Sequence, residues 1–462
     1  MDIINYITHN MINNISNEFT RLIKEEPTKP INIGEASITN CTSCCCKKEY
    51  VDINCNYFCG FDAKYKLFES NVCYHKNIKC SVMCKNIDCY ITDVKYLKNT
   101  GRYNVGIIIC YLRSIGAYVV GKVLERDNAY DDKTEPIQCE NKIYHIMSNI
   151  DFPHSLKYYG YAKLYATNDN DECKNKHDIQ TSKLAKEITI IFTEYAYIDY
   201  FFNQYDPHLK PKTIHHIVNS IHDLFKIFKI EIKNASECAN SNTSFLDVLK
   251  KKRAKKLLHE KYIIFQIIII LLIYNGIRLR HNDLSCQNVL LSFCDNVSTP
   301  IHYRVNNIDY IIKNFGYVVK ICDYGMSNMN NINNGLVYDN YFSKYGIYNN
   351  FCEHYDYFYI LNCIYHFLYL EEDTKLFIKR TIYPQLLTWN NDNNPNCQIY
   401  EGRLRNYNNC KILPDIHSIL LDDYFSDLYI EPDTHDINKN IYKIDIYGIK
   451  SSLDKCAQYS YG

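Results

Sequence analysis

Two short apolar runs and a helical pattern after them are the most regular features of the chain. Val105–Leu112 (VGIIICYL) and Ala117–Glu125 (AYVVGKVLE) predict strands, and the turn residues Ser114-Ile115-Gly116 between them predict a β-hairpin. Over residues 137–149 apolar side chains return at helical spacing, and Pro153 follows. These apolar positions are Ile137, Ile143, Tyr144, Ile146 and Met147. The pattern therefore predicts a hairpin that leads into a helix.

The most apolar segment runs from Tyr262 to Tyr274 (YIIFQIIIILLIY) and contains Gln266. It is shorter than the roughly 20 residues that a membrane-spanning helix needs. We therefore expect a buried core helix and no transmembrane segment.

Three polar segments precede this helix in the sequence. The run KKKRAKK at Lys250–Lys256 could be a nuclear or nucleic-acid signal or the solvated start of the apolar helix. We favour the second interpretation and predict no nucleic-acid partner. The stretches Asn168–His177 and Asn234–Thr243 predict surface loops.

The composition is that of a globular protein. Hydrophobic residues make up 47% of the 462 residues and charged residues 23%, which argues against a disordered chain. Lys+Arg and Asp+Glu are both 52, so no global field indicates a charged partner. The opening MDIINYITHN lacks the pattern of a secretory signal, so we expect the protein on the cytosolic side of membranes.

Cysteine is concentrated near the N-terminus, where ten of the 22 cysteines fall between Cys41 and Cys89. A Cys-rich N-terminal extension over residues 1–95 is therefore predicted. Several spacings suit Zn²⁺, although they are irregular. The candidate ligands are Cys41, Cys44, Cys55, Cys59, Cys73, His75, Cys80 and Cys84. A zinc site and a thiol-rich extension without metal both remain open.

The candidate chemistry begins with His281-Asn282-Asp283-Leu284-Ser285-Cys286-Gln287-Asn288, directly after the apolar helix. Phosphoryl transfer needs a carboxylate that takes or orients the hydroxyl proton, and an oxygen ligand for the phosphate-bound Mg²⁺. Asp283 and Asn288 suit these roles. A second motif, KICDYG, begins at the end of the predicted strand Tyr317–Ile321 and offers Asp323 as a second Mg²⁺ ligand.

An upstream phosphate-binding lysine and its acidic partner are then expected. Lys122 ends an apolar strand, where a lone cation would be costly unless phosphates and a carboxylate met it. Glu140 lies eighteen positions on (140 − 122), in the predicted helix. The stretch before Lys122 contains a partial glycine loop, in which backbone N–H groups can approach phosphates. Its candidate nucleotide contacts are Gly101, Tyr103, Gly106 and Ile108.

Over residues 96–370 these motifs, in this order, resemble the eukaryotic-type protein kinase family. Asn282 in H-N-D-L and the 35-residue gap (323 − 288) are similar to serine/threonine kinases of large nucleocytoplasmic DNA viruses, namely poxviruses, iridoviruses and giant amoebal viruses. The resemblance implies an α+β, two-lobed fold: a small β-rich N-lobe and hinge at 96–197 and a mainly helical C-lobe at 198–462. It implies host cytoplasm as the location, with the virion as a second one.

The resemblance also implies roles for individual residues. Lys122, held by Glu140, would position the ATP phosphates, and Asp283 would orient a protein Ser or Thr hydroxyl. Asn288 and Asp323 would hold Mg²⁺. Backbone groups of Glu194 and Ala196, after a predicted strand at Ile188–Phe192, would bind adenine, and Asp356 would brace the 281–288 loop.

Several positions depart from the family pattern. Tyr103 replaces a glycine, Ser285 replaces a lysine that touches the transferred phosphate, and no A-P-E follows Asp323. A kinase-like scaffold that binds partners, or a small-molecule kinase of related fold, therefore remains an alternative. Asn282 replaces an arginine that pairs with an activating phosphate, so we expect activity without phosphorylation between Met326 and Glu353.

Overall fold

The structure is a computed structural model, in which the chain divides into two compact units, Met1–Glu49 and Tyr50–Gly462. Everything below concerns the second unit. The structure describes residues 65–71, 91–98, 104–112, 117–126, 134–150, 152–168, 186–206, 209–241, 246–294, 300–305, 308–330, 332–338, 345–347, 351–389, 399–405 and 413–430. Helices and strands are mixed, which confirms the predicted α+β class.

The largest sheet has six antiparallel strands in the order β1-β5-β6-β4-β3-β2. Their bounds are Tyr65–Asn71 (β1), Ile91–Lys98 (β2), Asn104–Leu112 (β3), Ala117–Glu125 (β4), Tyr158–Asn168 (β5) and Lys186–Glu194 (β6). Pairing of β3 with β4 confirms the predicted hairpin, and β6 confirms the predicted strand at Ile188–Phe192. The sheet takes β1 and part of β2 from residues 1–95, the predicted Cys-rich extension.

Helix α2 (Pro136–Asn149) confirms the helix predicted after the hairpin. Two features stabilise its N-terminus: the Glu135 side chain accepts a hydrogen bond from the Gln138 N–H, and Pro136 needs no N–H partner. Its apolar face is buried through Ile137, Cys139, Ile143, Tyr144 and Met147. Glu140 is on this buried face as well.

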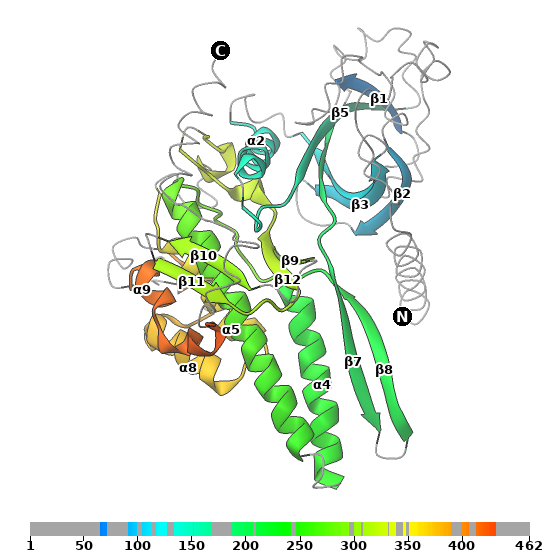
Figure 1. Cartoon of the computed structure of the whole chain (residues 1–462). Coiled ribbons are helices and arrows are strands. Elements are labelled where there is room, and N and C mark those ends of the chain that lie inside the picture. The colour runs from blue at the N-terminus through cyan, green and yellow to red at the C-terminus, as the bar shows by residue number, and fades with distance from the viewer. Residues whose placement is uncertain are drawn as a thin grey trace. The chain divides into compact units, whose positions relative to one another are not determined.

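The rest of the described chain is mainly helical (Figure 1). The α-helices are α4 (Ile221–Ser241), α5 (Leu246–Gly276), α7 (Tyr355–Phe367), α8 (Glu372–Thr381) and α9 (Ile416–Leu420). Short 3-10 helices are η5 (Tyr324–Met326), η6 (Gly335–Tyr338), η7 (Pro384–Leu386) and η9 (Asp423–Leu428). The hairpin of β7 (Ile198–Asp206) and β8 (Leu209–Val218) packs on α4, where the Tyr200 ring meets Phe228 edge-on at 5.7 Å.

Helix α5 forms the centre of the core. By length and composition it is the one described helix that could cross a membrane, but 89% of its most apolar window is buried inside the protein. Gln266 fits this environment because its Oε1 accepts a hydrogen bond from the Val319 backbone N–H at 3.0 Å. The apolar run is therefore a core helix, as predicted, and gives no clear transmembrane segment.

Two expectations about polar segments need correction. Asn234–Ser241, predicted as part of a loop, belongs to α4, because Ile232 and Ala235 continue the buried face of that helix and packing overrides weak helix propensity. The basic run begins on the exposed side of α5, as expected, but Lys256 at its end is fully buried. An ion pair with Glu260 at 2.6 Å makes this burial tolerable.

Three two-stranded antiparallel sheets complete the fold. They are β9 (Val289–Phe293) with β12 (Tyr317–Ile321), β10 (Ile301–Val305) with β11 (Ile308–Ile312), and β13 (Ile399–Tyr400) with β14 (Arg403–Leu404). In the first, Val289 lies opposite Ile321. This register places Asn288, just before β9, next to Cys322 and Asp323, just after β12.

Candidate active site

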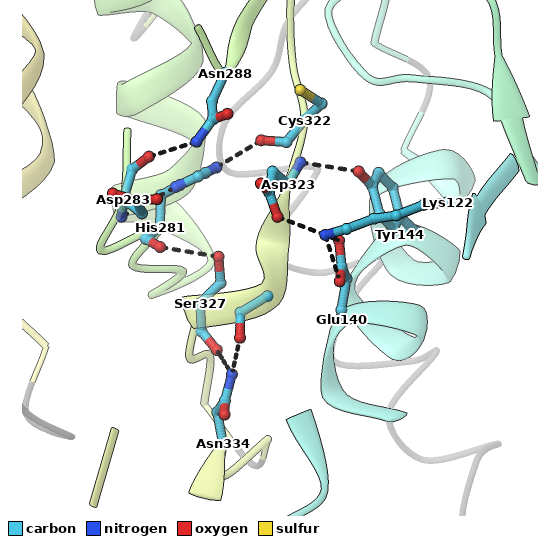
Figure 2. A network of polar contacts seen from close by, with 11 residues as sticks. Lys122, Glu140, Tyr144, His281, Asp283, Asn288, Cys322, Asp323, Ser327 and Asn334 are labelled. Carbon is cyan, nitrogen blue, oxygen red and sulfur yellow. Dashed lines mark hydrogen bonds and ion pairs between the residues drawn. The ribbon is translucent and has the colours of Figure 1, made fainter. Parts of the chain in front are cut away.

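A lysine between two carboxylates forms the centre of the candidate site (Figure 2). Lys122 on β4 contacts Glu140 on α2, with Nζ 2.8 and 2.9 Å from the two carboxylate oxygens. The same Nζ lies 2.6 Å from Oδ1 of Asp323. These three residues come from the sheet, the helix and the end of β12, and no two of them are closer than 18 positions in sequence.

Burial and charge act in opposite directions on this group. Burial alone would lower the pKa of Lys122, but the charges of Asp323 and Glu140 raise it well above its usual value. Burial raises the pKa of Glu140 against the opposing effect of Lys122. Burial would also raise the pKa of Asp323, yet the contact with Lys122 lowers it overall. The lysine therefore stays charged, and Asp323 is the partner that is firmly ionised.

The backbone at Asp323 is held in a left-handed conformation, with φ at +70°. A non-glycine residue adopts this conformation at some cost, so its surroundings must hold it there. The Asp323 N–H donates to the Tyr144 hydroxyl of α2 at 2.9 Å. Tyr144 packs edge-on against Tyr324 at 4.9 Å. Helix α2 thus fixes Asp323 through Tyr144 as well as through the Glu140–Lys122 pair.

A buried carboxylate braces the start of the 281–288 loop. Asp356, in the first turn of α7, accepts hydrogen bonds from the backbone N–H groups of His281 at 2.7 Å and Asn282 at 2.9 Å. Asn282 is left-handed, with φ at +68°, a conformation that asparagine tolerates better than most residues. Asp356 therefore has the bracing geometry that the resemblance implied.

Asp283 and Asn288 lie at opposite ends of one turn. The Asn288 side-chain amide donates to the Asp283 carbonyl at 2.8 Å, and the Cys322 N–H donates to the Asn288 carbonyl at 3.0 Å. Arg403 from β14 donates to the Asp283 carboxylate. Burial raises the pKa of Asp283, with Arg403 acting in the opposite direction. The Asp283 side chain is still 32% exposed, so it can meet a ligand.

The residues near Asp323 fit a magnesium ion. Because the Asn288 amide nitrogen is bound to the Asp283 carbonyl, the side-chain oxygen is the atom left to act as a ligand. Asp323 supplies a carboxylate that is 43% exposed, and the β9–β12 register brings the two residues together. Carboxylate and amide oxygens are hard ligands of the kind Mg²⁺ prefers.

The residues predicted to contact adenine, Glu194 and Ala196, already have hydrogen-bond partners within the protein. The Glu194 N–H donates to the Lys157 carbonyl at 2.9 Å, and the Glu194 side chain pairs with Lys320. The Ala196 carbonyl accepts a hydrogen bond from the Asn219 side chain at 2.8 Å. Their contact with adenine stays a prediction.

The partial glycine loop is described only at its end. Gly106 is buried on β3, and Ile108 is fully buried, close to Gly121 of β4. Ile108 thus packs between the two strands, and its contact with a nucleotide stays a prediction. Gly101 and Tyr103 lie outside the described residues.

The zinc candidates also lie outside the described residues. Within the described ranges, no group of three or more His, Cys, Asp or Glu side chains could hold a metal ion. The zinc site in residues 1–95 therefore stays a prediction.

Sequence reasoning missed Arg403 and Tyr144 as parts of the site. Arg403 lies 120 positions from Asp283 (403 − 283), and no motif links the two. Tyr144 was recognised only as an apolar position of the helix. Its spacing of four from Glu140 places both on one helix face, which is the signal that could have found it.

No model of a protein family matches the sequence, and no curated protein matches it.

Proposed function

We propose that the chain is a nucleotide-dependent phosphotransferase. The observation that carries the proposal is the Lys122 ion pair with Glu140 and Asp323, because a charged lysine beside an accessible carboxylate suits a polyphosphate with its metal ion. A carboxylate for the attacking hydroxyl, Asp283, lies on the adjoining loop. More specifically, we propose an ATP- and Mg²⁺-dependent protein kinase that acts on Ser and Thr hydroxyls.

The proposed fold is two-lobed. The sheet with α2 would form the small lobe, and the helices from α4 onward would form the large one. ATP would lie between them, with adenine at the backbone of Glu194 and Ala196. This assignment rests on the family resemblance together with the contact between Lys122 of the sheet and Asp323 after β12.

Each residue has a defined chemical task in this proposal. Lys122, fixed by Glu140, would bind phosphate oxygens, and Asn288 and Asp323 would hold the metal. When bound there, Mg²⁺ would supply positive charge that offsets the negative charge of the phosphates. Asp283 would orient the substrate hydroxyl and take its proton as the new O–P bond forms, while the bond from the γ-phosphorus to the bridging oxygen of ATP breaks and ADP leaves.

The choice of Ser/Thr protein substrates and of a viral enzyme in the host cytoplasm or virion rests on the resemblance alone. The direct test incubates the purified full chain with labelled ATP, Mg²⁺ and either casein, basic protein or small alcohols. We expect label on Ser and Thr of the proteins, lost on removal of Mg²⁺. The Asp283→Asn variant, purified in parallel, is the control for contaminating kinases.

Each alternative has its own outcome in this assay. Transfer to the alcohols but not to proteins would indicate a small-molecule kinase. No Mg²⁺-dependent turnover with any acceptor, from a folded protein, would indicate a scaffold that binds partners.

A further inference from the structure

The 281–288 loop contains the Asp283 carboxylate but no lysine or arginine that could pair with it. Between His281 and Asn288 the sequence contains neither residue, and position 285, two residues after Asp283, is a serine. The Ser285 N–H donates to the Asp283 carbonyl at 2.9 Å, so this position lies within the same tight turn. A half-buried carboxylate in such a loop needs a cation from elsewhere.

Arg403 supplies that cation. Its guanidinium donates to Oδ1 of Asp283, and its side chain is only 11% exposed. The guanidinium lies over the Tyr359 ring of α7 at 4.0 Å and over the Tyr345 ring at 5.6 Å. Contact with these aromatic rings restricts the direction in which the planar group can donate.

The hairpin that carries Arg403 is itself fixed. Its turn, Glu401-Gly402, has φ of +46° and +72°, and a Cβ on Gly402 would lie 2.1 Å from the Trp389 ring. Asn362 of α7 donates to the Gly402 carbonyl at 3.0 Å. Leu404, which follows Arg403, is buried in the core. Arg403 thus projects from a backbone that is anchored on both sides.

We propose that Arg403 is the positioning residue for Asp283, in the place where a lysine within the loop would otherwise act. This inference rests on the proposed function. Arg403 holds Oδ1, which fixes the carboxylate plane and leaves the second oxygen for the substrate hydroxyl. The arginine also places positive charge beside the carboxylate that would meet the acceptor hydroxyl.

The contact predicts a specific kinetic defect. Without Arg403 the carboxylate loses its fixed orientation, so the transition state suffers more than the binding of ATP does. For Arg403→Gln we expect kcat to fall about 10- to 100-fold, while KM for ATP changes by less than about threefold. Arg403→Lys keeps the charge but loses the planar fork, so we expect an intermediate loss.

Rescue separates positioning from simple packing. Ser285→Lys adds an ammonium group within the same turn, so the double variant Arg403→Gln/Ser285→Lys should recover at least about tenfold of the lost kcat. Packing on Tyr359 would not be restored by a lysine at 285. Arg380→Ala is the matched control: it removes an arginine that pairs with Asp422 and lies over Phe377, and its kcat should match the wild type.

The outcomes are distinguishable. A wild type without phosphotransfer overturns the proposed function itself. An active wild type with unchanged kcat in Arg403→Gln, a higher kcat, or a loss that Ser285→Lys does not recover overturns the positioning role alone. Circular dichroism and thermal melting monitor the fold, and if Arg403→Gln does not fold, Arg403→Lys with and without Ser285→Lys gives the same comparison.

Discussion

At the scale of single residues, two lysines of this protein have the same kind of partners and different surroundings. Lys122 lies between Glu140 and Asp323, and Lys256 lies between Glu260 at 2.6 Å and Glu371 at 3.0 Å. Lys256 and Glu260 are 0% exposed, whereas Asp323 is 43% exposed. Glu371 is 14% exposed, so the carboxylate that is most accessible to a ligand is Asp323 in the first arrangement. Exposure, and not the ion pairing itself, distinguishes the candidate site from a structural triad.

This difference predicts opposite results for two matched variants. Lys122→Met should reduce phosphotransfer to background, at least about 100-fold, because it removes the charge that meets the phosphates. Lys256→Met should keep the wild-type kcat per folded molecule but lower the free energy of unfolding by about 3 kcal/mol, because it leaves Glu260 buried without its cation. Initial rates and urea unfolding of both variants check this.

Asp323→Asn extends the test to the metal ligand. It keeps the side-chain volume and removes the negative charge, so activity should fall to background while the fold is retained. Full activity in Lys122→Met or in Asp323→Asn would contradict the site assignment.

At the scale of elements, Arg280 and Asn282, at the start of the 281–288 loop, hold the segment after Asp323 through hydrogen bonds to neutral groups. The buried Asn282 side chain donates to the Met326 carbonyl and to Asn328 Oδ1, both at 2.8 Å. Arg280, fully buried, donates to the Gly346 carbonyl at 2.6 Å and lies over the Tyr355 ring at 3.8 Å. These side chains already hold Met326, Asn328 and Gly346, among the described residues of that segment, without a phosphate.

Activity should therefore not depend on phosphorylation between Met326 and Glu353. Asn282 and Arg280 are both buried, so a phosphate on this segment could not pair with either and would add little ordering free energy. The test treats active protein with phosphatase, verifies by mass spectrometry that the segment is unmodified, and measures the initial rate. We expect a change of less than about twofold.

One exposed cation near this segment could pair with a phosphate and so contradict this prediction. Arg278 is exposed, and its guanidinium lies 5.2 Å from the Phe351 ring centroid. Loss of most activity on dephosphorylation, recovered on rephosphorylation and absent in Arg278→Ala, would show that Arg278 pairs with a phosphate.

At the scale of the whole molecule, the sequence predicted the features that depend on residues close together in the chain. The β3–β4 hairpin, α2 and the buried part of α5 follow from apolar periodicity, and the motif spacing identified Lys122 and Asp323, which the structure brings together. The end of α4 was missed because its polar sequence resembles a loop and its packing partners lie on other elements. Arg403 was missed for the same reason: its partner is defined by tertiary packing.

Two buried histidines connect the elements of the core and give the molecule an acid-sensitive stability. His154 lies between the Val319 carbonyl at 2.7 Å and the Tyr303 hydroxyl at 2.9 Å, a geometry that satisfies the neutral ring with its proton on Nδ1. Burial lowers the pKa of His154 to about 3, and Lys320 acts in the same direction. Burial also lowers the pKa of His259 to about 3, with Lys255 adding to the effect.

The direction of the pH effect follows from proton uptake. Above the ordinary histidine pKa of 6.5, His154 is neutral in the folded and the unfolded chain and contributes no pH dependence. Between 6.5 and about 3 the unfolded chain binds the proton and the folded chain does not, so each histidine lowers the free energy of unfolding by about 1.4 kcal/mol per pH unit as the pH falls.

His154→Asn should therefore reduce the slope of unfolding free energy against pH, between about pH 6 and pH 5, by up to that amount. Urea unfolding across this range measures the slope, and the slope between about pH 7 and pH 8, where the variant and the wild type should agree, is the internal control. An unchanged slope between about pH 6 and pH 5 would show that His154 takes up its proton in the folded state, and so that its buried contacts are broken in solution.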